Sequence, residues 1–108
     1  MTSFDDREKA YEKKFAHDEE LKFKASARRN RLLGRWAAEK LGLTGDDVEP
    51  YAKSVVLADL EEPGDEDVFR KIRRDFDDKG IEQSDHQIRR TMDEMMVRAV
   101  EEIEKERG

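Results

Sequence analysis

A proline-free stretch of about forty residues, from Phe4 to Leu43, changes its apolar pattern partway along. In its first part the large apolar residues are Phe4, Tyr11 and Phe15, which share one narrow stripe of a helix and are surrounded by charges. A stripe this thin cannot hold a helix in a hydrophobic core. The second part has the broad apolar face that a bundle helix buries, made of Leu21, Ala25, Leu32, Leu33, Trp36, Ala37 and Leu41.

The two faces are out of helical phase, because Leu21 and Phe23 lie well off the aromatic stripe. We therefore predict a break near residues 17–19, which divides the chain into an N-terminal arm (residues 1–17) and a helical bundle domain (residues 18–108). The arm has little apolar surface with which to dock on its own domain, and short isolated helices are marginal in water. We expect it to be flexible or partly helical in the free protein.

Capping residues and glycines divide the bundle domain into four predicted helices, the first from Asp18 to Leu41. The start and stop signals are Gly42, a Thr44–Asp47 capping box, the acids at 65–67, Gly80 and a Ser84–Gln87 capping box. The later apolar stripes are Val48, Tyr51, Ala52, Val55, Val56, Ala58 and Leu60; Val68, Phe69, Ile72 and Phe76; and Ile88, Met92, Met95, Met96, Ala99 and Ile103.

The helix after Thr44 has the widest of these later faces, and we expect it to be well buried. No segment alternates between apolar and polar residues over a useful length, so strands are not expected. The predicted fold class is all-α: a four-helix bundle with a flexible or partly helical N-terminal arm.

The composition suits a small helical protein with charged outer faces, since 46% of residues are charged and 35% are hydrophobic. The net charge of −6 argues against a dedicated nucleic-acid binder and against a protein held on an anionic membrane. No apolar run approaches the roughly eighteen residues that cross a bilayer, so we expect no direct membrane insertion. We expect the protein to remain in the compartment where it is made and to be monomeric when free.

Charge is distributed unevenly along the bundle domain. Residues 22–40 carry seven basic side chains against Glu39, whereas residues 41–67 carry nine acids against Lys53. Packed side by side, the two segments attract each other. The simplest interpretation is mutual neutralisation within the bundle.

The sequence offers little for catalysis. The histidines are His17 and His86, and neither follows a glutamate at the Glu-x-x-His spacing of a di-iron bundle. Cysteine is absent, and the glycines form neither a dinucleotide-binding nor a phosphate-binding loop. We predict no catalytic residue, no metal site and no tightly bound cofactor, and we do not expect an enzyme.

Two patterns are candidate binding surfaces. Lys24, Arg28, Arg31 and Arg35 share one side of the predicted first bundle helix, where they could meet phosphates or form only its solvated flank. The aromatic stripe of the arm has no evident internal partner, which favours docking into another protein. One alternative is therefore a nucleic-acid-binding or adaptor helical protein that uses the basic face from Lys22 to Arg35.

Two long segments of the chain resemble the zeta inhibitor subunit of bacterial F-type ATP synthases. They are FDDREKAYEKKFAHDEELKFKASARRNRLLGRWAAEKLG at 4–42 and YAKSVVLADLEEPGDEDVFRKIRRDF at 51–76. The most specific motifs are FDDRE at 4–8, KFAHD at 14–18, ARRN at 27–30, LLG at 32–34, WAAE at 36–39, VVLAD at 55–59 and GDEDVFRK at 64–71.

This resemblance implies an inhibitor of ATP hydrolysis whose N-terminal arm enters the catalytic head between the alpha, beta and gamma subunits and stops rotation. It implies apolar anchors at Phe4, Tyr11 and Phe15, with cations that pair with acids of the motor at Arg7, Lys13 and Lys14. It also implies a cytoplasmic protein, held at the inner membrane through the ATP synthase. Weak binding of ATP or ADP is a further implication, for which the candidate residues are Arg28, Arg31 and Arg35.

Overall fold

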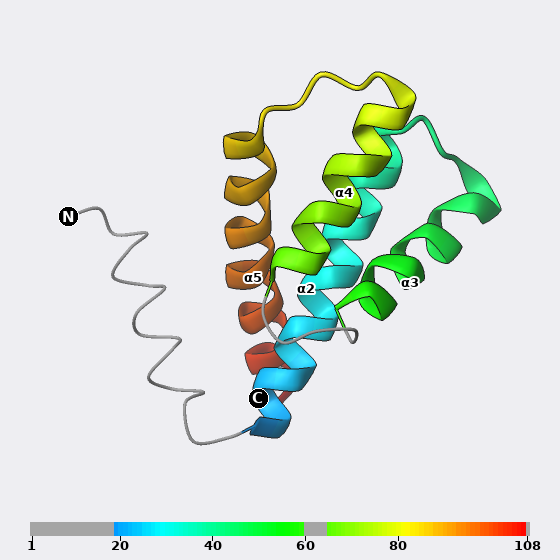
Figure 1. Cartoon of the computed structure of the whole chain (residues 1–108). Helices are drawn as coiled ribbons and strands as arrows, with labels where there is room; N and C mark the ends of the chain where they lie inside the picture. The colour runs from blue at the N-terminus through cyan, green and yellow to red at the C-terminus, as the bar shows by residue number, and fades with distance from the viewer. Residues whose placement is uncertain (1–18, 60–64, 108) are drawn as a thin grey trace.

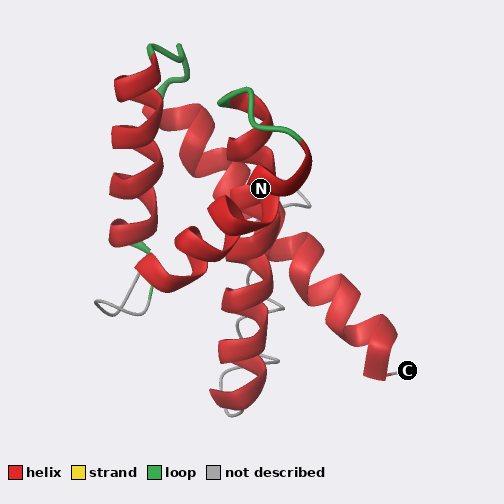
Figure 2. Ribbon diagram, turned by 90° about the vertical axis from the view of Figure 1, so that its right-hand side faces the viewer, coloured by secondary structure: helices red, strands yellow, loops and turns green. Residues whose placement is uncertain are grey.

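The computed structural model describes residues 19–59 and 65–107, with side chains from residue 20 to residue 106 outside the gap. Its helices are α2 (Glu19–Lys40), α3 (Val48–Ala58), α4 (Glu66–Lys79) and α5 (Asp85–Arg107), and a short 3-10 turn, η1 (Gly45–Asp47), precedes α3. These ranges contain no strand, and the prediction of an all-α four-helix bundle is confirmed (Figures 1 and 2). The predicted arm, and Asp18 with it, lies outside the described residues.

The long helix α2 is the centre of the bundle, with α3 packed along one side and α5 along another (Figure 1). The fourth helix, α4, packs against both α3 and α5. Within the described ranges, no helix is both long and apolar enough to cross a bilayer.

The hydrophobic core forms two clusters. The larger one combines buried side chains of all four helices: Leu33, Ala37, Val55, Val68, Phe69, Ile72, Phe76, Ile88 and Met92. The smaller one joins the beginning of α2 to the end of α5 through Ala25, Val100 and Ile103. Trp36 packs against the larger cluster with its ring centroid 5.7 Å from that of Phe76, so the prediction that it is a packing residue is confirmed.

A polar contact adds to the packing of α3 on α4. The hydroxyl of Tyr51 donates a hydrogen bond of 2.8 Å to Asp75, and Lys71 donates to the same carboxylate at 3.0 Å. Burial raises the pKa of the Tyr51 hydroxyl, and the bond to Asp75 adds to the effect because it favours the protonated form.

The predicted end of α4 and start of α5 are confirmed in detail. Gly80 adopts the left-handed conformation (φ 70°) that terminates a helix, and its N–H bonds to the carbonyl oxygen of Asp77 at 3.1 Å. Ser84 and Gln87 form the reciprocal capping box. The Gln87 N–H donates to the Ser84 hydroxyl at 3.1 Å, and the Ser84 N–H donates to the Gln87 side chain at 2.9 Å.

The predicted capping box of Thr44 with Asp47 is wrong. Residues 45–47 form the 3-10 turn instead, and Thr44 makes no side-chain capping bond. The backbone N–H of Asp47 bonds to the backbone carbonyl of Thr44, so Asp47 belongs to the 3-10 turn that precedes α3. The prediction that this helix is well buried is also wrong in part. Ala52 and Val55 of the predicted face are buried, but the other described members of that face are only half-buried: Val48, Tyr51, Val56 and Ala58.

Candidate functional site

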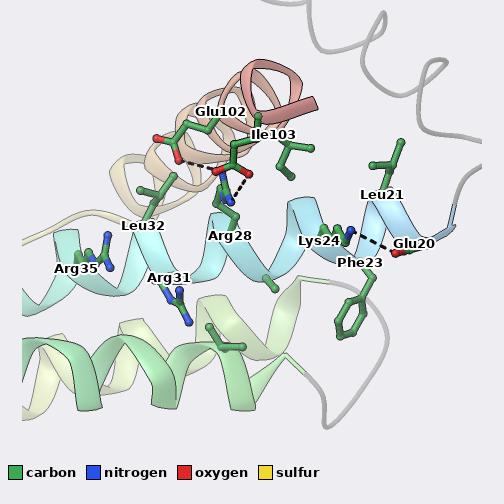
Figure 3. Close-up of a pocket in the computed structure, with 13 residues that line it drawn as sticks. Glu20, Leu21, Phe23, Lys24, Arg28, Arg31, Leu32, Arg35, Glu102 and Ile103 are labelled. Atoms are coloured by element: carbon green, nitrogen blue, oxygen red, sulfur yellow. Dashed lines mark hydrogen bonds and ion pairs between the residues drawn. The ribbon is translucent and has the colours of Figure 1, made fainter. Parts of the chain in front are cut away.

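A surface groove of about 890 Å³ runs along α2 from Glu20 to Arg35, between α3 and the last turns of α5 (Figure 3). Its apolar lining is Leu21, Phe23, Ala27, Leu32, Val56 and Ile103. Its charged lining is Glu20, Lys24, Arg28, Arg31, Arg35, Glu102 and Glu106. The four cations predicted to share one side of a helix therefore line one groove, together with acids that the sequence pattern did not place there.

Arg28 is tied to the α5 wall of the groove. Its guanidinium binds both carboxylate oxygens of Glu106, at 2.7 and 2.8 Å, and approaches Glu102 at 3.6 Å. The hydrogen bond raises the pKa of Arg28 and lowers that of Glu106, because each charge favours the other. Much of the charge of this candidate phosphate-binding residue is therefore already neutralised.

Two of the other cations also have carboxylate partners. Arg35 donates to Glu49 of α3 at 2.7 Å, and this bond lowers the pKa of Glu49. Lys24 pairs with Glu20 one turn earlier on α2, at 3.2 Å. Arg31 forms no ion pair with any described residue, although its charge helps to lower the pKa of Glu49, so it is the cation of the row least tied to a carboxylate.

The groove also exposes apolar surface near the start of α2. Phe23 is 62% exposed, and Figure 3 shows its ring directed toward the α3 side of α2, away from Leu21. A single exposed aromatic side chain is common on protein surfaces, so Phe23 does not by itself mark a binding site.

A second polar cluster is built on two buried residues of α2, Arg29 and Asn30, and sequence reasoning missed it. Arg29 is 2% exposed, donates to the side chain of Asn30 at 2.6 Å and forms an ion pair with Asp65 before α4 at 2.7 Å. Partial loss of water raises the pKa of nearby Asp93, and the charge of Asp65 raises it further. The spacing of Arg29 from Leu33, Trp36 and Ala37 places it on the buried face, a signal that its residue type concealed.

The described side chains include no group of three or more histidines, cysteines or acids that could hold a metal. The predicted arm residues (Phe4, Arg7, Tyr11, Lys13, Lys14 and Phe15) lie outside the described residues. Fold and groove together define a small, highly charged α-helical bundle with an open, mixed-charge binding surface.

The chain belongs to the ATPase inhibitor subunit zeta family, whose model matches residues 1–102. The resemblance seen in the sequence is thus confirmed, and the match extends well into α5. The chain is also similar to a structure solved by solution NMR, with 43% identity and a TM-score of 0.71 over 80% of this chain and 98% of that one. A comparison with curated proteins found no match.

Proposed function

We propose that this chain inhibits ATP hydrolysis by an F-type ATP synthase, with the arm as the inhibitory element and the bundle domain as its carrier. The proposal rests on the extent of the family match, which covers residues 1–102 and so includes the arm together with most of the bundle. The arm enters the catalytic head at the interface of the alpha, beta and gamma subunits and blocks rotation of gamma in the hydrolytic direction.

In this mechanism the arm acts through two kinds of contact. Phe4, Tyr11 and Phe15 supply the apolar anchors, since large aromatic side chains contribute most of the energy at such interfaces. The remaining contacts are ionic and join cations of the arm to acids on the motor: Arg7, Lys13 and Lys14.

The bundle supports this division of roles because α2 to α5 fill their cores with their own side chains. A folded carrier docked on the outside of the head holds the tethered arm at high effective concentration. On this proposal the protein is monomeric when free, remains in the cytoplasm and reaches the inner membrane only through the ATP synthase.

The rival function, nucleic-acid binding through the face from Lys22 to Arg35, is less well supported by the groove. Glu102 and Glu106 stand beside Arg28, and their charges repel a phosphate backbone. Weak binding of ATP or ADP remains a secondary proposal, with Arg31 as its best residue because Arg28 and Arg35 are ion-paired. Loss of ADP binding in Arg31→Ala, measured by calorimetry, tests it.

ATP hydrolysis by the isolated catalytic head of a related bacterial ATP synthase tests the main proposal. The intact chain should inhibit, whereas a chain starting at residue 18 and the double variant Phe4→Ala/Tyr11→Ala should not. The matched control is Leu57→Ala, which also removes an exposed apolar side chain but lies on α3 and should inhibit normally. Circular dichroism melts must show all variants folded.

Equal inhibition by the intact and shortened chains would place the activity in the bundle and overturn the role of the arm. Absence of inhibition by every version, with all of them folded, would overturn the proposed function itself.

A further inference from the structure

We propose that the beginning of α2 and the end of α5 open and close as one unit, and that Arg28 is the latch that holds this unit closed. The unit is the terminal helix pair, defined as residues 19–28 of α2 and residues 96–107 of α5. Its opening is a property of the bundle domain and requires no ATP synthase. Only the consequence for inhibition rests on the proposed function.

Little hydrophobic contact holds the terminal helix pair together. Figure 1 shows the beginning of α2 and the end of α5 extending beyond α3 and α4. The larger core cluster combines buried side chains of all four helices, whereas the smaller cluster belongs to α2 and α5. A segment with few buried apolar contacts opens at a lower free energy than the core of the same protein. The smaller cluster consists of the buried Ala25, Val100 and Ile103 and the partly buried Leu21 and Met96.

The boundary of the terminal helix pair on α2 lies between two neighbouring arginines. Arg29 is buried and forms an ion pair with Asp65 before α4 at 2.7 Å, which ties its position to the rest of the bundle. Leu33, one turn later, belongs to the larger core cluster. Arg28 bonds instead to the end of α5. The change of partner from α4 to α5 therefore marks where the unit begins.

Arg28 makes the ionic contact that joins the two helices of the pair. Its guanidinium binds both carboxylate oxygens of Glu106, at 2.7 and 2.8 Å, and lies 3.6 Å from Glu102. Such a bidentate pair fixes the geometry as well as adding energy. The hydrogen bond from Arg28 holds the pKa of Glu106 below its ordinary value, and the charge of Lys24 adds to this effect. Cations of α2 thus stabilise the ionised carboxylate at the end of α5.

The position of Glu106 couples the two helices. Glu106 lies in the last turn of α5, which ends at Arg107, and the helix dipole disfavours a carboxylate there. Arg28 offsets this cost while α2 lies against α5. Separation of the helices therefore removes the contact and also weakens the last turn of α5, so that the two helix ends open together.

The terminal helix pair lies where the carrier leads into the predicted arm, because α2 begins at Glu19. In the closed state the first turns of α2 give the arm a fixed base on the bundle. Opening adds residues 19–28 to the segment that connects the arm to the carrier. The length of that connection determines the effective concentration of the arm at its site, so on the proposed function the latch favours inhibition.

Native-state hydrogen exchange of the free, full chain, followed by NMR, tests the opening. Backbone amides of residues 23–28 and 100–106 should share one opening free energy, below that of core amides at 33–38 and 68–76. Arg28→Gln removes the charge but keeps a residue of similar helix propensity. It should accelerate exchange in both terminal segments about threefold, the size expected for loss of one exposed ion pair. Exchange of the core amides should not change.

Arg98→Gln is the matched control for this variant. Arg98 also donates to Glu102, at 3.2 Å, but both residues lie on α5. The substitution therefore removes an ion pair of the same kind without altering the contact between the two helices. Exchange of residues 23–28 should stay the same in this variant.

A charge exchange tests the latch itself. Arg28→Glu should accelerate exchange in both terminal segments more than Arg28→Gln, because Glu106 and Glu102 then face a third carboxylate. Adding Glu106→Arg in the same chain should reverse most of this increase, since the ion pair forms again with its charges exchanged. Failure of the second change to slow the exchange would contradict the role of the ion pair as the latch.

Three further results would overturn the proposal. If Arg28→Gln accelerated exchange at residues 23–28 and not at 100–106, the two helix ends would fray independently. If both segments exchanged at the same free energy as the core, the terminal helix pair would not open locally. An equal acceleration of residues 23–28 in Arg98→Gln would mean that the loss of a positive charge, and not the contact between the helices, produces the effect.

Discussion

Gly34 on α2 lies so close to Ala52 on α3 that a Cβ atom on Gly34 would be 2.6 Å from the Cα atom of Ala52. Side-chain carbons do not approach backbone atoms to this distance, so only glycine permits this approach of the two helices. The same crossing aligns the C-terminal half of α3 with the groove, where Val56 forms part of its wall.

Gly34→Ala should destabilise the bundle by about 1–3 kcal/mol, the usual cost of overpacking a close contact. The direction of this stability change is informative, because at an unconstrained helix position alanine is more stabilising than glycine by about 1 kcal/mol. Ala52→Gly should not rescue the variant, since the closest contact is with the backbone of residue 52. Urea unfolding followed by circular dichroism measures both, and a stabilised Gly34→Ala protein would contradict the close crossing.

Ser84→Ala should cost about 1 kcal/mol, because the Ser84 hydroxyl accepts the capping bond from Gln87 at the start of α5. Thr44→Ala is its matched control and should change stability little, because Thr44 makes no side-chain capping bond. Thermal melts of the two variants give the comparison. Equal losses would mean that the capping geometry does not determine the effect.

The ion pair of Arg29 with Asp65 connects the buried face of α2 to the start of α4. Asp65→Asn should destabilise the protein by about 1–2 kcal/mol, since a buried guanidinium loses its charged partner. It should also lower the pKa of Asp93, because the charge of Asp65 raises that pKa while Arg29 opposes it. Carboxyl titration by NMR measures the shift, and an unchanged Asp93 would contradict this coupling.

Stability should decrease on acidification. Arginine donors hold three glutamate pKa values below the ordinary value of 4.5, those of Glu49, Glu66 and Glu106. A carboxylate whose pKa is lowered by folding stabilises the protein above its unfolded pKa and loses that contribution as pH falls through the folded value. Asp93 has the opposite shift and favours the folded state at low pH, but it is one group against three. The urea concentration at the midpoint of unfolding should therefore stay constant near neutral pH and should decrease as the pH drops below about 4.5.

The sequence was sufficient for the features that depend on local pattern. Gly80 and the Ser84–Gln87 box were predicted because a left-handed glycine and a capping box need only their own few residues. The Thr44 box failed because a 3-10 turn competes for the same backbone donors, and composition alone does not decide between them.

Features that depend on contacts between helices were predicted only in part. The basic segment of α2 was expected to be neutralised by residues 41–67, and Arg35 does pair with Glu49, but Arg28 pairs with Glu102 and Glu106 of α5. Pairings so distant in the sequence depend on how the helices are arranged, which helical periodicity does not specify.

Arg31→Glu tests whether the groove contributes to the contact with the catalytic head. The variant leaves the arm unchanged, so on the proposed function it should inhibit ATP hydrolysis like the unmodified chain. Arg74→Glu is the matched control, because it reverses an exposed cation of α4 that does not line the groove. Weaker inhibition by Arg31→Glu alone would place Arg31 in the contact with the catalytic head, where it would bind an acid of the motor.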